Sequence, residues 1–177
     1  MNGRPRIYVA SIADYNAGRL HGHWIDDCTD PAAVHDAITQ LLAESTEPYA
    51  EEWAIHDFDG FAPVQLGEYE SVEMVARLAA GITEHGTAYA AWAASLDRSE
   101  WDDRLDDFLD AFRGSCDSPT DFAAQLVDDM GFGQWDDAVP EWLRPYVSLD
   151  YKALARDLSA DYSFTETGGV VYVFDAS

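Results

Sequence analysis

The sequence predicts an α+β fold, and three features of the chain lead to this prediction. Short β-branched and aromatic runs occur in the first and last thirds, whereas the middle third shows apolar residues at helical spacing. Apolar residues make up 47% of the chain and aromatic residues 13%, which is enough apolar surface to bury a core. A length of 177 residues allows one ordinary domain or two to three very small ones.

The first third is predicted to be a β-β-α-β unit. Its strands are expected where β-branched and aromatic residues cluster, at Arg6–Ile12, Leu20–Ile25 and Glu52–Phe58. A polar turn at residues 14–18 separates the first two strands. Asp30 followed by Pro31 fits the cap and the first position of a helix, which ends before the next proline.

The middle third is predicted to be entirely helical. Ser71 can cap a helix that ends at Gly86, and the alanine-rich segment Thr87–Leu96 is expected to form a second helix. Ser99, with Asp102 three residues later, is similar to a capping box that would begin a third and strongly acidic helix.

The last third begins with a helix whose start is sharply marked. Ser118 fits the cap, Pro119 the first helical position, and an acid follows three residues after the cap, so we expect a helix that runs to Gly131. The next segment, Gly133–Tyr146, contains two prolines and is expected to be a loop with a short helical turn.

A further helix and a hairpin are predicted to close the chain. Ser148 is expected to cap a helix over residues 149–158. Two strands are then expected on either side of a Thr-Gly-Gly turn, at Tyr162–Thr165 and Val170–Phe174.

The chain is strongly acidic, with 34 acids against 10 bases and a net charge of −24. Such a charge argues against direct binding of nucleic acid, anionic lipid or acidic substrates, and it favours a basic partner. The net charge is −4 over residues 1–48, −11 over 49–113 and −9 over 114–177. This uneven distribution indicates that the negative charge is concentrated in particular parts of the chain. The alternative is general salt adaptation, because aspartate is abundant and Lys152 is the single lysine.

The acidity is densest in the segment Asp97–Arg113. On a helical wheel its apolar face would comprise Trp101, Leu105, Phe108, Leu109 and Phe112. Seven acids and two arginines between positions 97 and 110 give about one net negative charge per 4 Å of helix, close to the roughly 3.4 Å spacing of phosphates along one DNA strand. The spacing favours a surface that imitates nucleic acid, against the alternative of an ordinary solvated helix face. Periodicity leaves open whether Ala111–Cys116 continues this helix or forms a strand.

The residue pattern does not indicate metal or catalytic chemistry. His21 and His23 would share one face of a strand, but no third ligand has diagnostic spacing, and His35 and His56 do not supply one. The paired aspartates come without a glycine-rich phosphate loop or a catalytic lysine, and neighbouring helical positions diverge by about 100°. No serine or cysteine lies in a nucleophile-elbow context. The sequence therefore predicts a protein that is not an enzyme and holds no metal or cofactor.

The cysteines and tryptophans are expected to have ordinary structural roles. Cys28 and Cys116 are lone and far apart, as in a reduced cytosolic protein without disulfides. No signal peptide precedes the first strand, and no apolar run approaches the roughly 20 residues that span a bilayer. Core positions are expected for Trp53, Trp92, Trp101 and Trp142.

Several segments, in the same order along nearly the whole chain, resemble the ArdA-type antirestriction proteins of plasmids, conjugative transposons and phages. The segments that carry this resemblance are Arg6–Asp26, Glu51–Phe61, Tyr69–Leu78, Asp128–Leu158 and Gly169–Phe174. Beyond Leu78 the middle third matches only loosely, so its charges cannot be carried over residue by residue.

The resemblance implies an elongated, dimeric DNA mimic with three small domains, at residues 1–67, 68–107 and 108–177. Such a protein would inhibit type I restriction-modification enzymes in the bacterial cytoplasm by occupying the DNA-binding groove of the methyltransferase core. The resemblance also implies that Ala111–Cys116 is a strand that joins the terminal hairpin in a three-stranded antiparallel sheet. The stretch Asp128–Tyr146 would then be the antirestriction motif, near the dimer contact.

Two sets of residues are therefore expected to bind partners. The expected phosphate-mimicking acids are Asp97, Glu100, Asp102, Asp103, Asp106, Asp107, Asp110, Asp117, Asp121, Asp128 and Asp129. The expected dimer-contact or motif residues are Met130, Gly131, Phe132, Trp135, Asp136, Asp137, Val139 and Trp142.

The total charge also bears on the expected shape. Two chains would carry 48 negative charges, the charge of about 24 base pairs or some 80 Å of duplex, whereas a compact chain of this length has a radius of gyration near 16 Å. Mimicry therefore predicts an extended shape. The alternatives are an acidic interaction module for another basic DNA-binding protein and a salt-adapted domain without mimicry.

Overall fold

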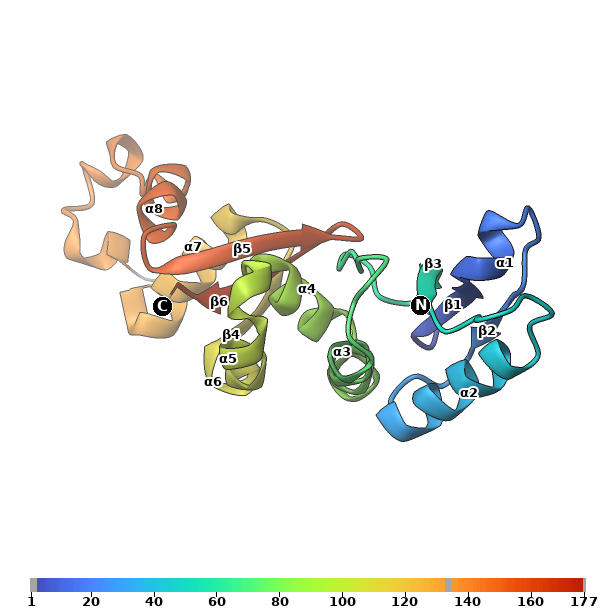
Figure 1. The fold of residues 1–177 in the computed structure, drawn as a ribbon. Helices are drawn as coiled ribbons and strands as arrows, with labels where there is room; N and C mark the ends of the chain where they lie inside the picture. The colour runs from blue at the N-terminus through green and yellow to red at the C-terminus, as the bar shows by residue number, and fades with distance from the viewer. Residues whose placement is uncertain (1–2, 133–134, 177) are drawn as a thin grey trace. The chain divides into compact units, whose positions relative to one another are not determined.

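The computed structural model describes residues 3–132 and 135–176, and it has the predicted α+β fold (Figure 1). The chain divides into two compact units, Met1–Ala94 and Ser95–Ser177. The part of the chain that the structure describes contains one three-stranded antiparallel sheet in each unit. The finer division into three domains stays a prediction.

The sheet of the N-terminal unit has its first strand in the centre. Strand β1 (Arg6–Ser11) pairs antiparallel with β2 (Gly22–Ile25) on one side and with β3 (Trp53–Asp59) on the other. Ile7 and Val9 of the central strand are fully buried. The three predicted strands are thus confirmed, and β2 begins two residues later than expected.

A short helix, α1 (Ile12–Asn16), replaces the polar turn predicted after the first strand. The backbone N–H of Asp14 donates to the hydroxyl of Ser11 at 3.4 Å, so Ser11 caps this helix. The prediction of a turn over residues 14–18 was wrong at its start, because Asp14 lies inside the helix as a buried hydrogen-bonding group.

Helix α2 (Pro31–Ala43) covers this sheet and packs against β1, β2 and helix α3 (Val72–His85). The predicted cap is confirmed, because the carboxylate of Asp30 accepts the N–H of Ala32 at 2.9 Å. Ser71 likewise caps α3 by accepting the N–H of Met74 at 3.2 Å.

Helix α4 (Thr87–Ser95) follows α3 after a single connecting glycine, Gly86, whose φ of 66° lies in the left-handed region. The two helices approach closely at Gly81, where a Cβ atom would overlap the ring of Tyr89. Trp92 of α4 is 1% exposed, so its predicted core position is confirmed.

The sheet of the C-terminal unit has the strand order β4-β6-β5 and is antiparallel (Figure 1). Its strands are β4 (Phe112–Cys116), β5 (Tyr162–Thr167) and β6 (Val170–Asp175). Gly168 and Gly169 both have positive φ, as a two-residue hairpin turn requires. The hairpin and the strand that joins it are therefore confirmed.

Two longer helices accompany this sheet. Helix α7 (Pro119–Val127) starts at the predicted cap, since Ser118 accepts the N–H of Asp121 at 3.2 Å, and it packs against helix α8 (Tyr151–Leu158). The expected cap of α8 was wrong: Asp150, rather than Ser148, accepts the N–H of Ala153 at 2.9 Å.

The remaining elements of the C-terminal unit are short. The helix predicted to run to Gly131 changes type after Val127, where a π-type turn η3 (Asp128–Phe132) follows. The 3-10 turns η4 (Trp135–Ala138) and η5 (Arg144–Tyr146) lie in the segment that was expected to be a loop with a short helical turn. Over the described residues, every helix is too short or too polar to cross a membrane.

Candidate acidic interaction surface

The acidic segment is a chain of short helical pieces instead of one continuous helix. It consists of η1 (Arg98–Glu100), α5 (Trp101–Arg104), η2 (Leu105–Asp107) and α6 (Phe108–Ala111), and it leads directly into β4. The helical conformation thus ends at Ala111, and the strand begins one residue later than the resemblance implies.

The buried side of this segment is built from three large side chains. Trp101, Leu105 and Phe108 are 5%, 0% and 4% exposed. Phe108 stacks on Phe112 with ring centroids 5.3 Å apart and lies near Phe174 of β6, at 6.5 Å. The segment is therefore fastened to the sheet of its own unit by apolar contacts.

The predicted apolar face was wrong at Leu109, whose side chain is 70% exposed. In a 3-10 turn, residues three apart eclipse one another, so η2 places Phe108 directly above Leu105. Leu109 then lies about 100° away from the buried side. The wheel drawn for a continuous α-helix missed this change of phase.

The opposite side of the segment is a row of exposed carboxylates. Its members, called the acidic row below, are Asp102, Asp103, Asp106, Asp107 and Asp110. Among the residues that the structure describes, Asp103, Asp107 and Asp110 form no ion pair. Like charges three or four residues apart destabilise a helix by about 0.2–0.5 kcal/mol per pair, so the row is held together against its own repulsion.

Glu100 lies in the same segment but serves a structural purpose. Its carboxylate accepts the N–H of Asp97 at 2.9 Å and a hydrogen bond from Arg104 at 3.2 Å. The Asp97 N–H, followed by the Arg104 guanidinium, lowers the pKa of Glu100. This contact closes the first turn, so the capping box predicted for Ser99 and Asp102 was wrong and is shifted two residues earlier.

The arginines of the segment are engaged by their neighbours. The guanidinium of Arg98 lies over the ring of Trp101, 5.0 Å from its centroid. Arg104 bonds to Glu100, and Arg113 forms a two-point ion pair with Asp175, whose carboxylate raises the pKa of Arg113. Each of these arginines is thus engaged by a neighbouring side chain: Trp101, Glu100 or Asp175.

The other expected mimic acids follow later in the same unit. Asp117 lies in the turn after β4, Asp121 lies in the first turn of α7, and Asp128 and Asp129 open η3. All four are exposed. Asp121 also accepts the hydroxyl of Ser118 at 2.6 Å, so it is partly committed to capping.

The motif residues bring apolar side chains to the surface. Met130 is 64% exposed and Trp142 is 73% exposed, so the predicted core position of Trp142 was wrong. Asp137 forms a solvent-exposed ion pair with Arg144 at 3.5 Å. Further members are Gly131 with a φ of 80° and the half-buried Val139. The side chains of Phe132, Trp135 and Asp136 lie outside the described residues.

The remaining two tryptophans with expected core positions differ from each other. Trp101 is buried as predicted, whereas Trp53 is half-buried at the start of β3. Exposed apolar residues that sequence reasoning did not single out accompany the motif: Tyr146, Val147 and Leu149.

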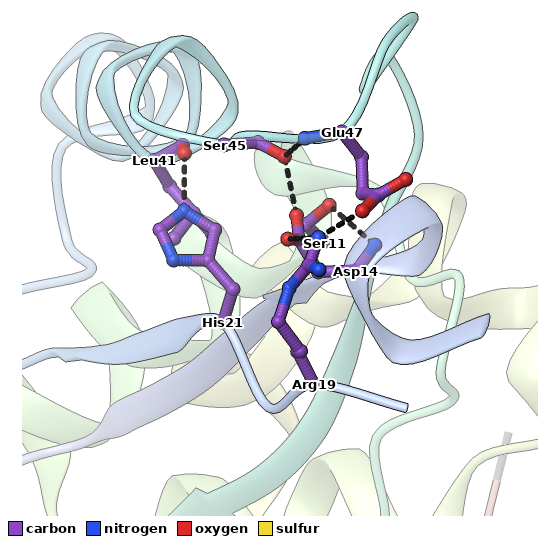
Figure 2. Close-up of polar contacts among 7 residues, drawn as sticks. All are labelled: Ser11, Asp14, Arg19, His21, Leu41, Ser45 and Glu47. Atoms are coloured by element: carbon purple, nitrogen blue, oxygen red, sulfur yellow. Dashed lines mark hydrogen bonds and ion pairs between the residues drawn. The ribbon is translucent and has the colours of Figure 1, made fainter. Parts of the chain in front are cut away.

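The N-terminal unit contains a buried carboxylate that the sequence prediction missed (Figure 2). Asp14 is 1% exposed, and it accepts the hydroxyl of Ser45 at 2.5 Å and the guanidinium of Arg19 at 3.3 Å. Arg19 also pairs with Glu47. The Ser45 hydrogen bond, more than any other contact, lowers the pKa of Asp14. The cluster ties α1 to the loop that follows α2, and only the tertiary fold brings these residues together.

The histidines are dispersed among unrelated contacts. The ring of His21 lies 2.8 Å from the carbonyl oxygen of Leu41 (Figure 2), and His35 pairs with Glu73 at 3.0 Å. His56 packs edge-on against Tyr15. In the described part of the chain, no three histidine, cysteine or acidic side chains form a group that could hold a metal ion.

The negative charge is more evenly divided between the two units than between thirds of the sequence. The N-terminal unit carries fifteen acids and four bases, a net charge of −11. The C-terminal unit carries nineteen acids and six bases, a net charge of −13. The acidic row is therefore distinguished by its density and by its apolar anchor, and less by the total charge of its unit.

Comparison with known proteins adds one finding. A family model described as antirestriction protein (ArdA) matches residues 7–171, which is nearly the whole chain. No curated protein matches the chain.

Proposed function

Because the chain belongs to the ArdA family of antirestriction proteins, we propose that it inhibits type I restriction-modification enzymes as a mimic of DNA. Membership in this family implies an antirestriction function and interaction with restriction-modification enzymes. The family consists of inhibitor proteins. The proposal adds the type of enzyme and the means of inhibition: carboxylates replace phosphates in the DNA-binding groove of the methyltransferase core, in the cytoplasm of the bacterial host.

The observation that carries this proposal is the acidic row on its apolar anchor. Trp101, Leu105 and Phe108 fix one side of the segment, and the aspartates project from the other. Aspartate holds its carboxylate close to the backbone, so the charges of the row move little relative to the buried side. A fixed row of charges suits recognition by lysines and arginines that are arranged to bind a stiff polyanion.

The charged side chains of the acidic segment also support this role. Arg98, Arg104 and Arg113 are engaged by Trp101, Glu100 and Asp175, whereas the carboxylates of the acidic row are exposed. Basic groups of a DNA-binding groove would gain several weak contacts here. Each such exposed pair contributes about 0.2–1 kcal/mol, so removal of single acids should weaken binding in small, graded steps.

We further propose that the inhibitor acts as a homodimer joined through the motif. Met130, Trp142 and Tyr146 are exposed apolar residues within one stretch of chain, and apolar residues gathered on a surface commonly mark a protein interface. Two copies would also double the negative charge presented to the enzyme.

The proposal is tested with the purified methyltransferase core of a type I enzyme. The wild-type protein should bind this core with an affinity that falls steeply as salt concentration rises. Asp103→Asn and Asp107→Asn should each weaken binding about two- to fivefold, and the double variant should weaken it further.

A charge-matched control is available in the N-terminal unit. The exposed Asp36 lies on α2, and Asp36→Asn removes the same charge as Asp103→Asn. This control should change binding less than the variants of the acidic row. Equal effects of all three substitutions would indicate general charge attraction and count against a mimic surface localised at the acidic row. Tight binding to a basic nucleoid protein, with none to the methyltransferase core, would favour the acidic-module alternative.

A further inference from the structure

The N-terminal unit contains a groove that the acidic row does not explain. A hollow of about 560 Å³ is lined by Ile12, Glu51, Glu52, Trp53, Tyr69 and Glu70. A second hollow of about 380 Å³ shares Ile12 and Tyr69 with the first and is lined further by Tyr15, His56 and Glu68. The two hollows thus adjoin at Ile12 and Tyr69, and together they are called the aromatic groove below.

Backbone hydrogen bonds fix the walls of the aromatic groove. The N–H of Ile12 donates to the carbonyl oxygen of Glu52 at 3.0 Å, which ties the start of α1 to the residue before β3. The N–H of Ile55 donates to the carbonyl oxygen of Glu68 at 2.8 Å, which ties the loop carrying Tyr69 to β3. The groove is therefore part of the folded unit and is present before any ligand arrives.

The aromatic side chains of the groove face solvent. Tyr69 is 75% exposed and Tyr15 is 59% exposed, and Trp53 is half-buried at the start of β3. Tyr15 is braced by His56, with ring centroids 5.0 Å apart. Large exposed rings along a groove commonly mark a binding surface.

The charges of the groove select the kind of ligand. Four glutamates line it, and none of its described lining residues is a lysine or an arginine. Such a lining repels phosphates and carboxylates. Aromatic faces beside carboxylates attract cations, and a guanidinium can lie flat on a ring while it donates two hydrogen bonds to a carboxylate.

We propose that the aromatic groove binds an arginine side chain of the basic partner protein, as a second contact site apart from the acidic row. The inference rests on the proposed function only in taking the partner to be a basic protein. Tyr69 and Trp53 supply the aromatic faces, and Glu51 and Glu52 supply the carboxylates. This site would add selectivity, because a flat guanidinium fits it better than a lysine ammonium does.

The proposal is tested first with short peptides and the full chain. A capped peptide with two arginines is titrated into the wild-type protein, and the indole N–H signal of Trp53 is followed by two-dimensional NMR. The arginine peptide should shift this signal in a saturable manner, and the same peptide with neutral citrulline should not. Equal shifts with both peptides would overturn the inference.

Matched variants then locate the site. Tyr69→Ala should weaken peptide binding at Trp53 about two- to fivefold. Tyr49→Ala should leave binding unchanged, since Tyr49 is 90% exposed in the same unit but does not line the groove. Unchanged binding by Tyr69→Ala, with both proteins folded by circular dichroism, would refute the role of the groove.

A second pair of variants separates the groove from the general field of the protein. Glu51→Gln with Glu52→Gln removes two groove charges, whereas Asp36→Asn with Glu84→Gln removes two exposed charges elsewhere in the unit. Only the first pair should weaken peptide binding severalfold. Equal weakening by both pairs would contradict a localised site.

Failure of this inference can be distinguished from failure of the proposed function. If the acidic-row variants weaken binding to the methyltransferase core while Tyr69→Ala does not, the groove proposal falls and the mimic proposal stands. If the peptide binds at Trp53 but the acidic-row variants bind the core normally, the groove proposal stands and the mimic proposal falls.

Discussion

Leu105 and Leu109 lie four residues apart in the acidic segment, and truncation of the first should destabilise the protein far more than truncation of the second. Leu105 is 0% exposed, and Leu→Ala at a fully buried site costs about 2–5 kcal/mol of unfolding free energy. Leu109 is 70% exposed, so Leu109→Ala should change the free energy by less than about 0.5 kcal/mol. The two substitutions remove the same atoms, so each is the control of the other.

The assay is thermal unfolding of the full chain, with near-ultraviolet circular dichroism of the tryptophans as the signal. For a unit of about this size, 1 kcal/mol corresponds to roughly 4–8 °C in Tm, so Leu105→Ala should lower the transition of the C-terminal unit by about 8 °C or more. Leu109→Ala should lower it by no more than about 4 °C. A continuous α-helix with Leu109 inside would make the two losses equal, and that result would refute the broken-helix geometry.

Three further predictions concern charge, pH and thiol chemistry. Changing Asp103 and Asp107, which lie four residues apart, to Asn together should raise Tm by about 1–4 °C at low salt and less at molar salt, because like-charge repulsion of about 0.2–0.5 kcal/mol is removed. An unchanged Tm at low salt would contradict repulsion within the row. The lowered pKa of Asp14 means that its stabilising effect is present above the pKa of an unfolded aspartate, about 3.9, and is lost as pH falls through the lower folded value. Denaturant titrations across this acid range should therefore show a weaker pH dependence for Asp14→Asn than for the wild type, and identical slopes would count against the cluster. Burial raises the pKa of the Cys28 thiol to about 12, so iodoacetamide at mildly alkaline pH should modify Cys28 only after unfolding, as mass spectrometry would show; rapid modification of the folded protein would be inconsistent with this burial.

Three helix starts and the terminal hairpin were predicted correctly, whereas two other local caps were not, since Asp150 replaces Ser148 and a box of Asp97 and Glu100 replaces that of Ser99 and Asp102. Ser71, Asp30 and Ser118 each cap the helix that the sequence assigned to them, because a cap is formed by residues within three positions of one another. The terminal hairpin followed from two adjacent glycines that supply the positive φ of a tight turn.

Other errors arose where tertiary packing or a change of helix type decides the outcome. The wheel for the acidic segment assumed 100° per residue throughout, and one 3-10 turn was enough to move Leu109 from the buried to the exposed side. Trp142 was expected in the core because it is large and apolar, but sequence alone does not show which apolar residues remain on the surface.

The sequence predicted one of the candidate sites and missed two others. The acidic row could be found from sequence, since its aspartates are neighbours in the chain and their spacing follows from helical geometry. The Asp14 cluster could not, because Ser45 lies 31 residues away and approaches only when α2 packs on the sheet. The aromatic groove was missed for the same reason: Tyr15, Trp53 and Tyr69 come from three separate segments.

The central claim is that the protein occupies the place of DNA on its target enzyme. The most direct measurement is a competition experiment, in which a fluorescent duplex bound to a type I methyltransferase core is titrated with the protein. Mimicry predicts that the wild-type protein displaces the duplex completely and that variants of the acidic row do so less effectively, in order of the number of charges removed. A complex in which the enzyme holds both the duplex and the protein at once would contradict the claim.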